Sequence, residues 1–202
     1  MIRKMMILLM LLFLTSTSAW ALEIGGVELP DTLKAGDSDL ILNGAGLRKK
    51  FGMKIYAVGL YLKAKSGDGQ AVMDGDAPMA LQMRWRMKVP PKKIDETFYE
   101  SLALSTGAPK ASAYGPLTDF GSITKDVVSF MTWIAKRETT KTDSWIFIYV
   151  PGKGTEVHVH DGTTDELMGL IPGIDFKKVL FGVWLMEDPP VGKSLRDDLL
   201  GK

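Results

Sequence analysis

The chain has 202 residues, of which 46% are hydrophobic and 24% are charged, and its formal net charge is +1. This length is typical of one domain, and the balance of charges gives no electrostatic reason to expect nucleic acid or an acidic membrane as a partner. The absence of cysteine excludes disulfides, thiol catalysis and thiolate metal sites, so the fold must depend on its core alone.

The amino end has the composition of a secretory signal peptide. Arg3 and Lys4 precede an apolar run over residues 5–14, and the Ala-Trp-Ala sequence that ends at Ala21 offers the small–x–small pattern of a cleavage site. The run is about ten residues long, whereas a spanning helix needs ~20, so we expect a cleaved leader rather than an anchor. The pattern therefore predicts export to the periplasm without a stable membrane span, with a signal peptide over residues 1–21 and one domain over residues 22–202.

Two apolar strands flank a basic, glycine-containing bend in the first third of this domain. A short strand at residues 40–42 leads through Arg48 to a long strand at residues 53–62. Both faces of the long strand are mostly apolar, which indicates cover on both sides, and Ala57 and Gly59 leave room for a close approach to its backbone. The flanking segments are expected to form an edge strand, at residues 23–29, and mostly loop, at residues 63–78.

Residues 79–89 alternate strictly between two kinds of side chain. Large apolar side chains, from Met79 to Val89, point one way, and the other face carries Ala80, Gln82, Arg84, Arg86 and Lys88. Such a pattern predicts a strand with one buried and one wet face. The basic residues could bind anions, but a solvated strand face is the interpretation that we prefer.

The rest of the chain predicts two groups of helices separated by strands. The prolines at positions 90 and 91 end the strand and begin an amphipathic helix that runs to about Ser105. Further on, we expect a helix at residues 116–136, strands at 145–150, 155–160 and 167–171, a helix from Asp175, and a short last helix capped by Ser194 with Asp197 at the capping-box position. Strands joined by tight turns, with helices on one face, predict an α+β fold with a largely antiparallel sheet.

Four short segments are the most distinctive in the sequence: residues 42–48 (LNGAGLR), 54–62 (KIYAVGLYL), 149–155 (YVPGKGT) and 171–176 (IPGIDF). Together with the end of the chain, they resemble the chalcone isomerase-like family, and specifically its exported bacterial members. The resemblance covers nearly all of the mature chain. It implies an open-faced β-sandwich, in which helices are layered on one face of a curved antiparallel sheet and a ligand cleft lies between them.

The plant isomerases of this family close a flavanone ring with an arginine, a strand threonine, a helical tyrosine and asparagine, and a late threonine or serine. By this resemblance Arg48 matches the arginine, whereas Tyr56 replaces the strand threonine and Val183 the late residue. The single asparagine, Asn43, lies in the wrong segment. The local candidates for the helical tyrosine are Tyr99 and Tyr114. The resemblance therefore favours a non-catalytic protein, with an isomerase (intramolecular lyase) acting on a chalcone-like enone as the alternative.

Other plant relatives bind fatty acids, and they keep the arginine and have a tyrosine near the strand position. A guanidinium grips a carboxylate with two parallel hydrogen bonds, and a phenol hydroxyl adds a third donor. If the bend after Arg48 is a tight turn, Arg48 and Tyr56 lie opposite each other with Cβ atoms ~4.5–5.5 Å apart, whereas a straight backbone separates them by about 26 Å. We expect a cleft for a small amphipathic molecule such as a fatty acid, with Arg48 and Tyr56 as ligand-binding residues and Val58, Val183 and Trp184 in its lining.

The two histidines, His158 and His160, lie on one face of a predicted strand and could chelate zinc or copper. A third ligand is needed, and Glu156 and Asp161 are weak candidates, so we expect no metal and no cofactor. A solvated hairpin edge is the expected environment of both histidines. A periplasmic protein-interaction module that uses the basic strand face is a third functional class, and the pattern leaves the oligomeric state undetermined.

Overall fold

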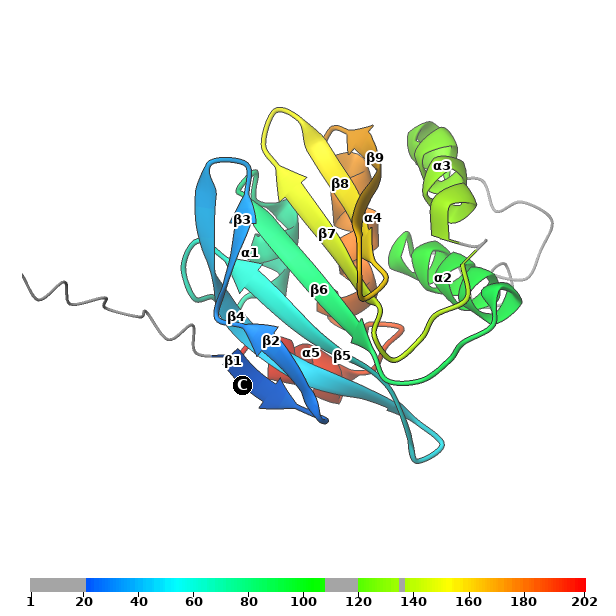
Figure 1. Cartoon of the computed structure of the whole chain (residues 1–202). Helices are drawn as coiled ribbons and strands as arrows, with labels where there is room; N and C mark the ends of the chain where they lie inside the picture. The colour runs from blue at the N-terminus through cyan, green and yellow to red at the C-terminus, as the bar shows by residue number, and fades with distance from the viewer. Residues whose placement is uncertain (1–20, 108–119, 135–136) are drawn as a thin grey trace, which may run out of the picture.

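The computed structural model describes residues 21–107, 120–134 and 137–202 (Figure 1). Its strands are β1 (Ala21–Ile24), β2 (Val27–Pro30), β3 (Thr32–Ala35), β4 (Ser38–Lys50), β5 (Met53–Leu62), β6 (Met79–Trp85), β7 (Ser144–Val150), β8 (Gly154–His160) and β9 (Asp165–Pro172). Its helices are α1 (Gly69–Asp74), α2 (Pro91–Ser105), the 3₁₀ turn η2 (Gly121–Ile123), α3 (Thr124–Ile134), α4 (Asp175–Leu185) and α5 (Lys193–Leu199). Within these residues, none of the helices has the length and apolar character needed to cross a membrane.

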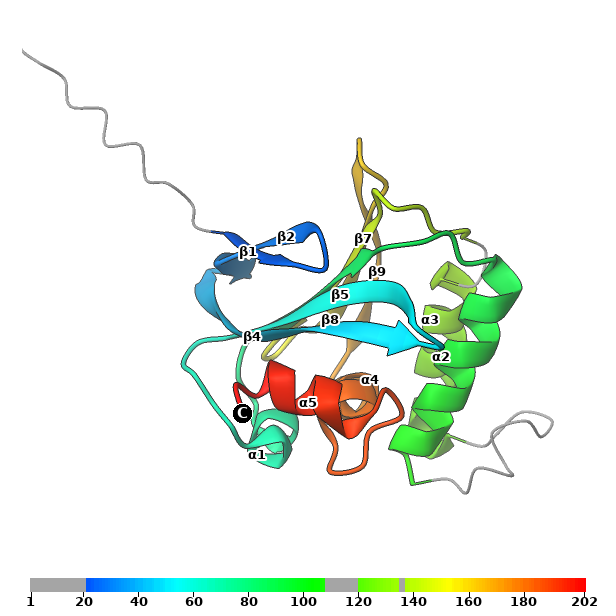
Figure 2. The same ribbon diagram turned by 90° about the horizontal axis from the view of Figure 1, so that it is seen from below.

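The architecture is α+β, as the sequence predicts. In the described residues, seven strands form one antiparallel sheet in the order β3-β4-β5-β6-β7-β8-β9, and helices lie against one of its faces. The strand order follows the chain, which tight turns between antiparallel neighbours allow. Figure 2 shows α1, α4 and α5 on one side of β4 and β5, and the separate β1–β2 hairpin on the other.

The main core fills the space between the sheet and helices α2, α3 and α4. The ring of Phe98 on α2 lies 5.9 Å from Trp145 and 6.3 Å from Trp184 between centroids. On α3, Phe130 lies 5.7 Å from Phe147 of β7. The apolar stripes of these helices therefore form core, which is the role that amphipathic helices on a sheet normally have.

The sequence predicts a wet outer face for the strand at residues 79–89, and this prediction is wrong for the first half of the segment, whereas Lys88 beyond the strand is exposed. Strand β6 ends at Trp85, Ala80 is fully buried and Gln82 is 6% exposed. Ala80 belongs to a second small cluster, whose other buried members are Ala35, Leu40 and Tyr61. This cluster forms because β3 and the start of β4 bend across the outer side of β6 and β7. Alternation within one strand carries no information about such distant cover.

The segment at residues 23–29 forms part of a hairpin, β1 and β2, rather than the single edge strand that the sequence predicts. Gly25 and Gly26 make its turn with positive φ angles of 62° and 85°, which glycine adopts without steric cost. Leu29 of β2 is fully buried, and its Cδ1 lies 3.3 Å from the position that a Cβ on Gly59 would occupy. Leu42 Cδ1 comes closer still, at 2.9 Å, so the predicted close approach at Gly59 is confirmed, and β4 and this hairpin both contribute to it.

Three local predictions also differ from the structure. Helix α1 forms inside the segment predicted as mostly loop, with the Asp68 side chain accepting a hydrogen bond from the Ala71 backbone. The last helix begins after Gly192, and Ser194 does not cap it. The helix predicted at residues 116–136 is shorter where it is described, since η2 and α3 together cover Gly121 to Ile134, and residues 116–119 and 135–136 lie outside the described residues.

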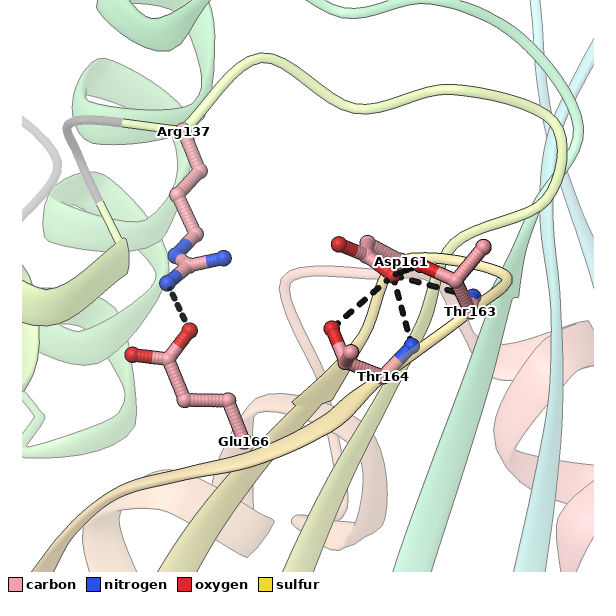
Figure 3. Close-up of polar contacts among 5 residues, drawn as sticks. All are labelled: Arg137, Asp161, Thr163, Thr164 and Glu166. Atoms are coloured by element: carbon pink, nitrogen blue, oxygen red, sulfur yellow. Dashed lines mark hydrogen bonds and ion pairs between the residues drawn. The ribbon is translucent and has the colours of Figure 1, made fainter.

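One carboxylate organises the turn between β8 and β9. Figure 3 shows Asp161 facing Thr163 and Thr164, whose backbone N–H groups donate to its Oδ1 at 3.0 Å and 2.9 Å. The hydrogen bond from the Thr164 backbone is the largest of the effects that hold the pKa of Asp161 well below its usual range. Nearby, Arg137 pairs with Glu166 of β9 at 2.5 Å. These contacts hold β9, the edge strand at the opposite side of the sheet from β3.

Candidate ligand-binding site

A tight hairpin between β4 and β5 brings Arg48 and Tyr56 together. The two residues pair directly in the antiparallel register, and Lys50 pairs with Met53 across a two-residue turn. The tight turn expected from the sequence is therefore confirmed. A bulge lies between Arg48 and the next residue, and bulges of this kind re-aim side chains at the edges of sheets.

The Arg48 guanidinium is partly buried, and within the described residues a single hydrogen bond fixes its direction. Its Nη1 donates to the backbone oxygen of Val191 at 2.5 Å, across 143 positions of sequence. In the described residues, no carboxylate lies within ion-pair distance of Arg48. Because a guanidinium carries five N–H donors, this arrangement leaves donors available to an anion.

Tyr56 is 7% exposed and places its hydroxyl beside Trp184. The hydroxyl oxygen accepts a hydrogen bond from Trp184 Nε1 at 3.2 Å. Burial raises the pKa of Tyr56 to about 12, although the hydrogen bond from Trp184 and the charge of Arg48 both act to lower it. The phenol therefore keeps its proton at neutral pH, and that O–H remains a donor.

A cavity of about 510 Å³ opens beside this pair. Its walls come from the β4–β5 hairpin tip, the end of β6, helix α2, the carboxyl end of α4 and the loop before α5. Apart from its charged members, its lining is mainly apolar and aromatic: Phe51, Met53, Ile55, Tyr56, Trp85, Met87, Val89, Pro90, Ile94, Phe98, Leu104, Val183, Trp184, Pro190 and Val191. This volume lies within the ~300–1,000 Å³ that pockets for small molecules occupy.

The charged residues of the lining are mostly basic. Four are basic, Arg48, Lys50, Lys88 and Lys93, and one is acidic, Glu100. Lys88 and Lys93 each pair with a glutamate, at 2.8 Å and 3.1 Å, whereas no ion pair of Arg48 or Lys50 is found within the described residues. Basic side chains around an apolar cavity raise the local concentration of negatively charged ligands.

Four of the five predicted site residues meet at this cavity. Arg48, Tyr56, Val183 and Trp184 line it, whereas Val58 is fully buried in the main core and is absent from the lining. Val58 shares the inward face with Tyr56, but it lies two residues nearer the middle of the sheet, under the helices. One face of β5 thus contributes Tyr56 to the cavity wall and Val58 to the main core.

Sequence reasoning did not find two polar residues of α2, Thr97 and Ser101, that also line the cavity. They lie four residues apart and alternate with Ile94 and Phe98 at helical spacing. The only indication in the sequence is that these two small polar residues interrupt the apolar stripe of the helix. Trp85, another lining residue, has an indole N–H for which no hydrogen-bond partner is found within the described residues.

Comparison with protein families matches residues 21–201 to the chalcone isomerase-like family. The chain belongs to the chalcone isomerase-like family. Among solved structures, it is similar to a fatty-acid binding protein of Arabidopsis thaliana with a TM-score of 0.65 and 17% sequence identity, over 87% of this chain and 92% of the other. The likeness at this identity shows a shared fold. A search of curated protein sequences found no match.

The positions that plant isomerases of the chalcone isomerase-like family use are only partly filled here. Asn43 is buried away from the cavity, where its amide donates to the backbone oxygens of Leu199 and Ser66 at 2.8 Å and 3.0 Å. Tyr99 packs on Phe120 and is not part of the cavity lining, and Tyr114 lies outside the described residues. Of the five roles, Arg48 alone has a matching side chain within the described cavity lining.

The histidines lie elsewhere, on β8, which is an interior strand and not the hairpin edge that the sequence suggests. His158 Nε2 lies 3.2 Å from Glu156 Oε2, and its Nδ1 lies 3.8 Å from Asp165. The described residues contain no group of three or more histidine, cysteine, aspartate or glutamate side chains arranged to hold a metal ion.

Proposed function

We propose that this protein is exported and binds a small amphipathic carboxylate, such as a fatty acid, without catalysing a reaction on it. One observation carries the proposal. Arg48 and Tyr56 pair across the β4–β5 hairpin and both line a mainly apolar cavity, and no protein carboxylate pairs with Arg48 in the described residues. A partly buried guanidinium without an anion is costly, and a ligand carboxylate would offset that cost.

The geometry suits a carboxylate head group. Val191 occupies one N–H of Arg48 and so holds the guanidinium in place, which leaves the other donors for the two oxygens of a ligand. Tyr56 receives a hydrogen bond from Trp184 and can donate its own proton to the same head group. The aromatic and aliphatic lining then accepts the hydrocarbon chain. The activity in the name of the similar Arabidopsis protein, fatty-acid binding, agrees with this ligand class.

The alternative, an isomerase acting on a chalcone-like enone, has weaker support. Only Arg48 of the family's polar set lies in the described lining, and Val183 stands at the late position. The third class, an interaction module on the basic strand face, has a smaller surface than the sequence suggests: Ala80 and Gln82 are buried, and Arg86 donates a hydrogen bond to the Gly26 backbone of the β1–β2 hairpin. Cyclisation of a chalcone above the background rate and dependent on Arg48 would overturn the non-catalytic proposal.

The proposal that the protein is exported depends on the sequence of residues 1–21. Its basic start, short apolar run and small-residue end are the three parts of a signal peptide. The intact mass of the protein recovered from a periplasmic extract should correspond to a chain that begins near Leu22. A retained leader would contradict this part of the proposal.

Ligand binding is tested by calorimetry on protein that has been unfolded, delipidated and refolded. We expect Arg48→Gln to weaken binding of a long-chain fatty acid about 10- to 100-fold, since hydrogen bonds to charged groups contribute ~1.5–3 kcal/mol. Tyr56→Phe should weaken it about 3- to 10-fold. The matched control is Arg137→Gln, which removes an arginine paired with Glu166 and outside the cavity lining.

The methyl ester of the same fatty acid separates the head group from the chain. It should bind the wild type as weakly as the free acid binds Arg48→Gln, and it should be nearly insensitive to that substitution. Equal binding of the acid by wild type and Arg48→Gln would remove the head-group role of Arg48.

A further inference from the structure

The tip of the β4–β5 hairpin is exposed along its whole length. Six consecutive residues, Lys49 to Lys54, are exposed, with Phe51 at 89% and Met53 at 48%. Figure 1 shows this hairpin extending beyond the body of the molecule. Phe51 buries little of its surface in the folded chain, so core packing does not explain an aromatic side chain at this position.

The backbone at the tip makes phenylalanine a poor choice for folding. Phe51 has a φ of +50° and Gly52 a φ of +76°, so both central residues of the two-residue turn are left-handed. Turns of this type favour asparagine, aspartate or glycine at the first position, and a bulky residue there is strained. Phe51 is the only non-glycine residue with positive φ in the described chain.

The charge of the tip is local rather than a property of the whole chain. Lys49, Lys50 and Lys54 flank the exposed Phe51, and no acidic residue interrupts the run from Arg48 to Lys54. No ion pair of these three lysines is found in the described residues. Although the net charge of the chain is only +1, the hairpin tip carries a concentrated basic patch around Phe51 and Met53.

We propose that this hairpin tip, residues 49–54, docks the protein on a lipid bilayer that carries anionic headgroups, with Phe51 inserted between the lipids. Lysines that ring a small apolar group match a bilayer, because the ammonium groups meet the headgroups while the ring enters the acyl boundary. A single projecting aromatic residue gives little flat area for a protein partner, which normally buries a broad patch.

The position of the tip gives docking a consequence. Lys50, Phe51 and Met53 also line the cavity, so insertion of Phe51 would bring the cavity mouth to the headgroup level. An amphipathic molecule could then pass between bilayer and cavity without crossing bulk water. Docking itself needs no ligand in the cavity. It therefore goes beyond the proposed function and is tested independently of ligand binding.

The test is flotation of the purified protein without its apolar leader, with vesicles of phosphatidylglycerol and phosphatidylethanolamine and no fatty acid added. We expect binding to these vesicles, loss of binding to pure phosphatidylcholine, and weakening by added salt. Phe51→Asn should lower the partition coefficient at least tenfold. Replacing the three lysines by glutamine should lower it about fivefold per lysine.

Two controls keep the result interpretable. Leu167→Asn makes the same kind of change at a side chain that is 55% exposed on β9, and it should leave vesicle binding within twofold. Phe51→Asn should unfold at the same or higher temperature than the wild type, because asparagine suits the turn, so a folding defect would not account for lost binding. Flotation of Phe51→Asn equal to wild type, or equal binding to phosphatidylcholine, would overturn the proposal.

Discussion

Lys177 shows how one buried side chain can hold a short element in place. It is fully buried on α4, and its Nζ donates to the backbone oxygens of Val72, Met73 and Gly75 at 2.9, 2.6 and 2.8 Å. These carbonyls end helix α1, which at six residues is too short to be stable alone. A cation at the negative end of a helix is favourable, and the Tyr149 ring lies 5.2 Å away.

Lys177→Met should therefore destabilise the protein by about 2–4 kcal/mol, because three buried carbonyls lose their donor. Urea unfolding at neutral pH measures the change. Lys178→Met is the matched control, since Lys178 is partly exposed and pairs with Asp74 at 3.5 Å. We expect that change to stay within about 0.5 kcal/mol. Equal losses for both variants would show that the carbonyl contacts of Lys177 contribute little.

At the scale of elements, the Asn-Gly-Ala-Gly segment of β4 sets how closely α5 packs on the sheet. A Cβ on Gly44 would collide with the backbone oxygen of Asp198 and lie 2.5 Å from that of Leu199. Asn43 beside it donates to the Leu199 oxygen and accepts from the Ser66 backbone at 2.7 Å. Gly44 thus leaves room for the carboxyl end of α5, and Asn43 donates a hydrogen bond to the Leu199 carbonyl at that end.

Gly44→Ala should destabilise the protein by about 2–3 kcal/mol, because backbone rather than flexible side chains blocks the new methyl group. Gly67→Ala is the control: its Cβ would lie 3.4 Å from Lys202 Cε, an ordinary contact, and its φ is not positive. Thermal unfolding of the two variants gives the comparison. A Gly44→Ala protein as stable as Gly67→Ala would mean that α5 can shift outward at little cost.

Across the whole molecule, what the sequence predicts well is local. The pairing of Arg48 with Tyr56 follows from two strands and a short bend, and period-two patterns report such neighbours directly. The cover over β6 and the contact from Arg48 to Val191 depend on segments far apart in the chain. A single strand or loop carries no trace of those contacts, which is why the outer face was predicted wrongly and Val191 was not found.

Burial of tyrosines on both faces of the sheet predicts how stability responds to alkali. Burial raises the pKa of Tyr56 and of Tyr149 to about 12, and that of Tyr61 higher still, whereas an unfolded tyrosine titrates near 10. Above pH ~10 the native state holds more protons than the unfolded state, so the free energy of unfolding falls as pH rises. Burial lowers the pKa of Lys177 to about 8. Between pH ~8 and ~10.5 the unfolded state therefore holds more protons at this residue, so Lys177 makes the free energy of unfolding rise with pH.

We therefore expect the stability that these tyrosines contribute to be complete below pH ~10 and to fall above it, with the contributions of Tyr56 and Tyr149 lost by pH ~12 and that of Tyr61 at higher pH. Each tyrosine adds a slope of at most about 1.4 kcal/mol per pH unit. Urea unfolding across this range, with tyrosinate absorbance followed in parallel, measures both quantities. Tyr56→Phe should make the slope shallower by up to that amount, since a phenylalanine has no proton to lose. A free energy of unfolding that stays level through pH ~11 would mean that these hydroxyls reach water in the native state, and the low-dielectric setting assumed for the Arg48–Tyr56 pair would fail with it.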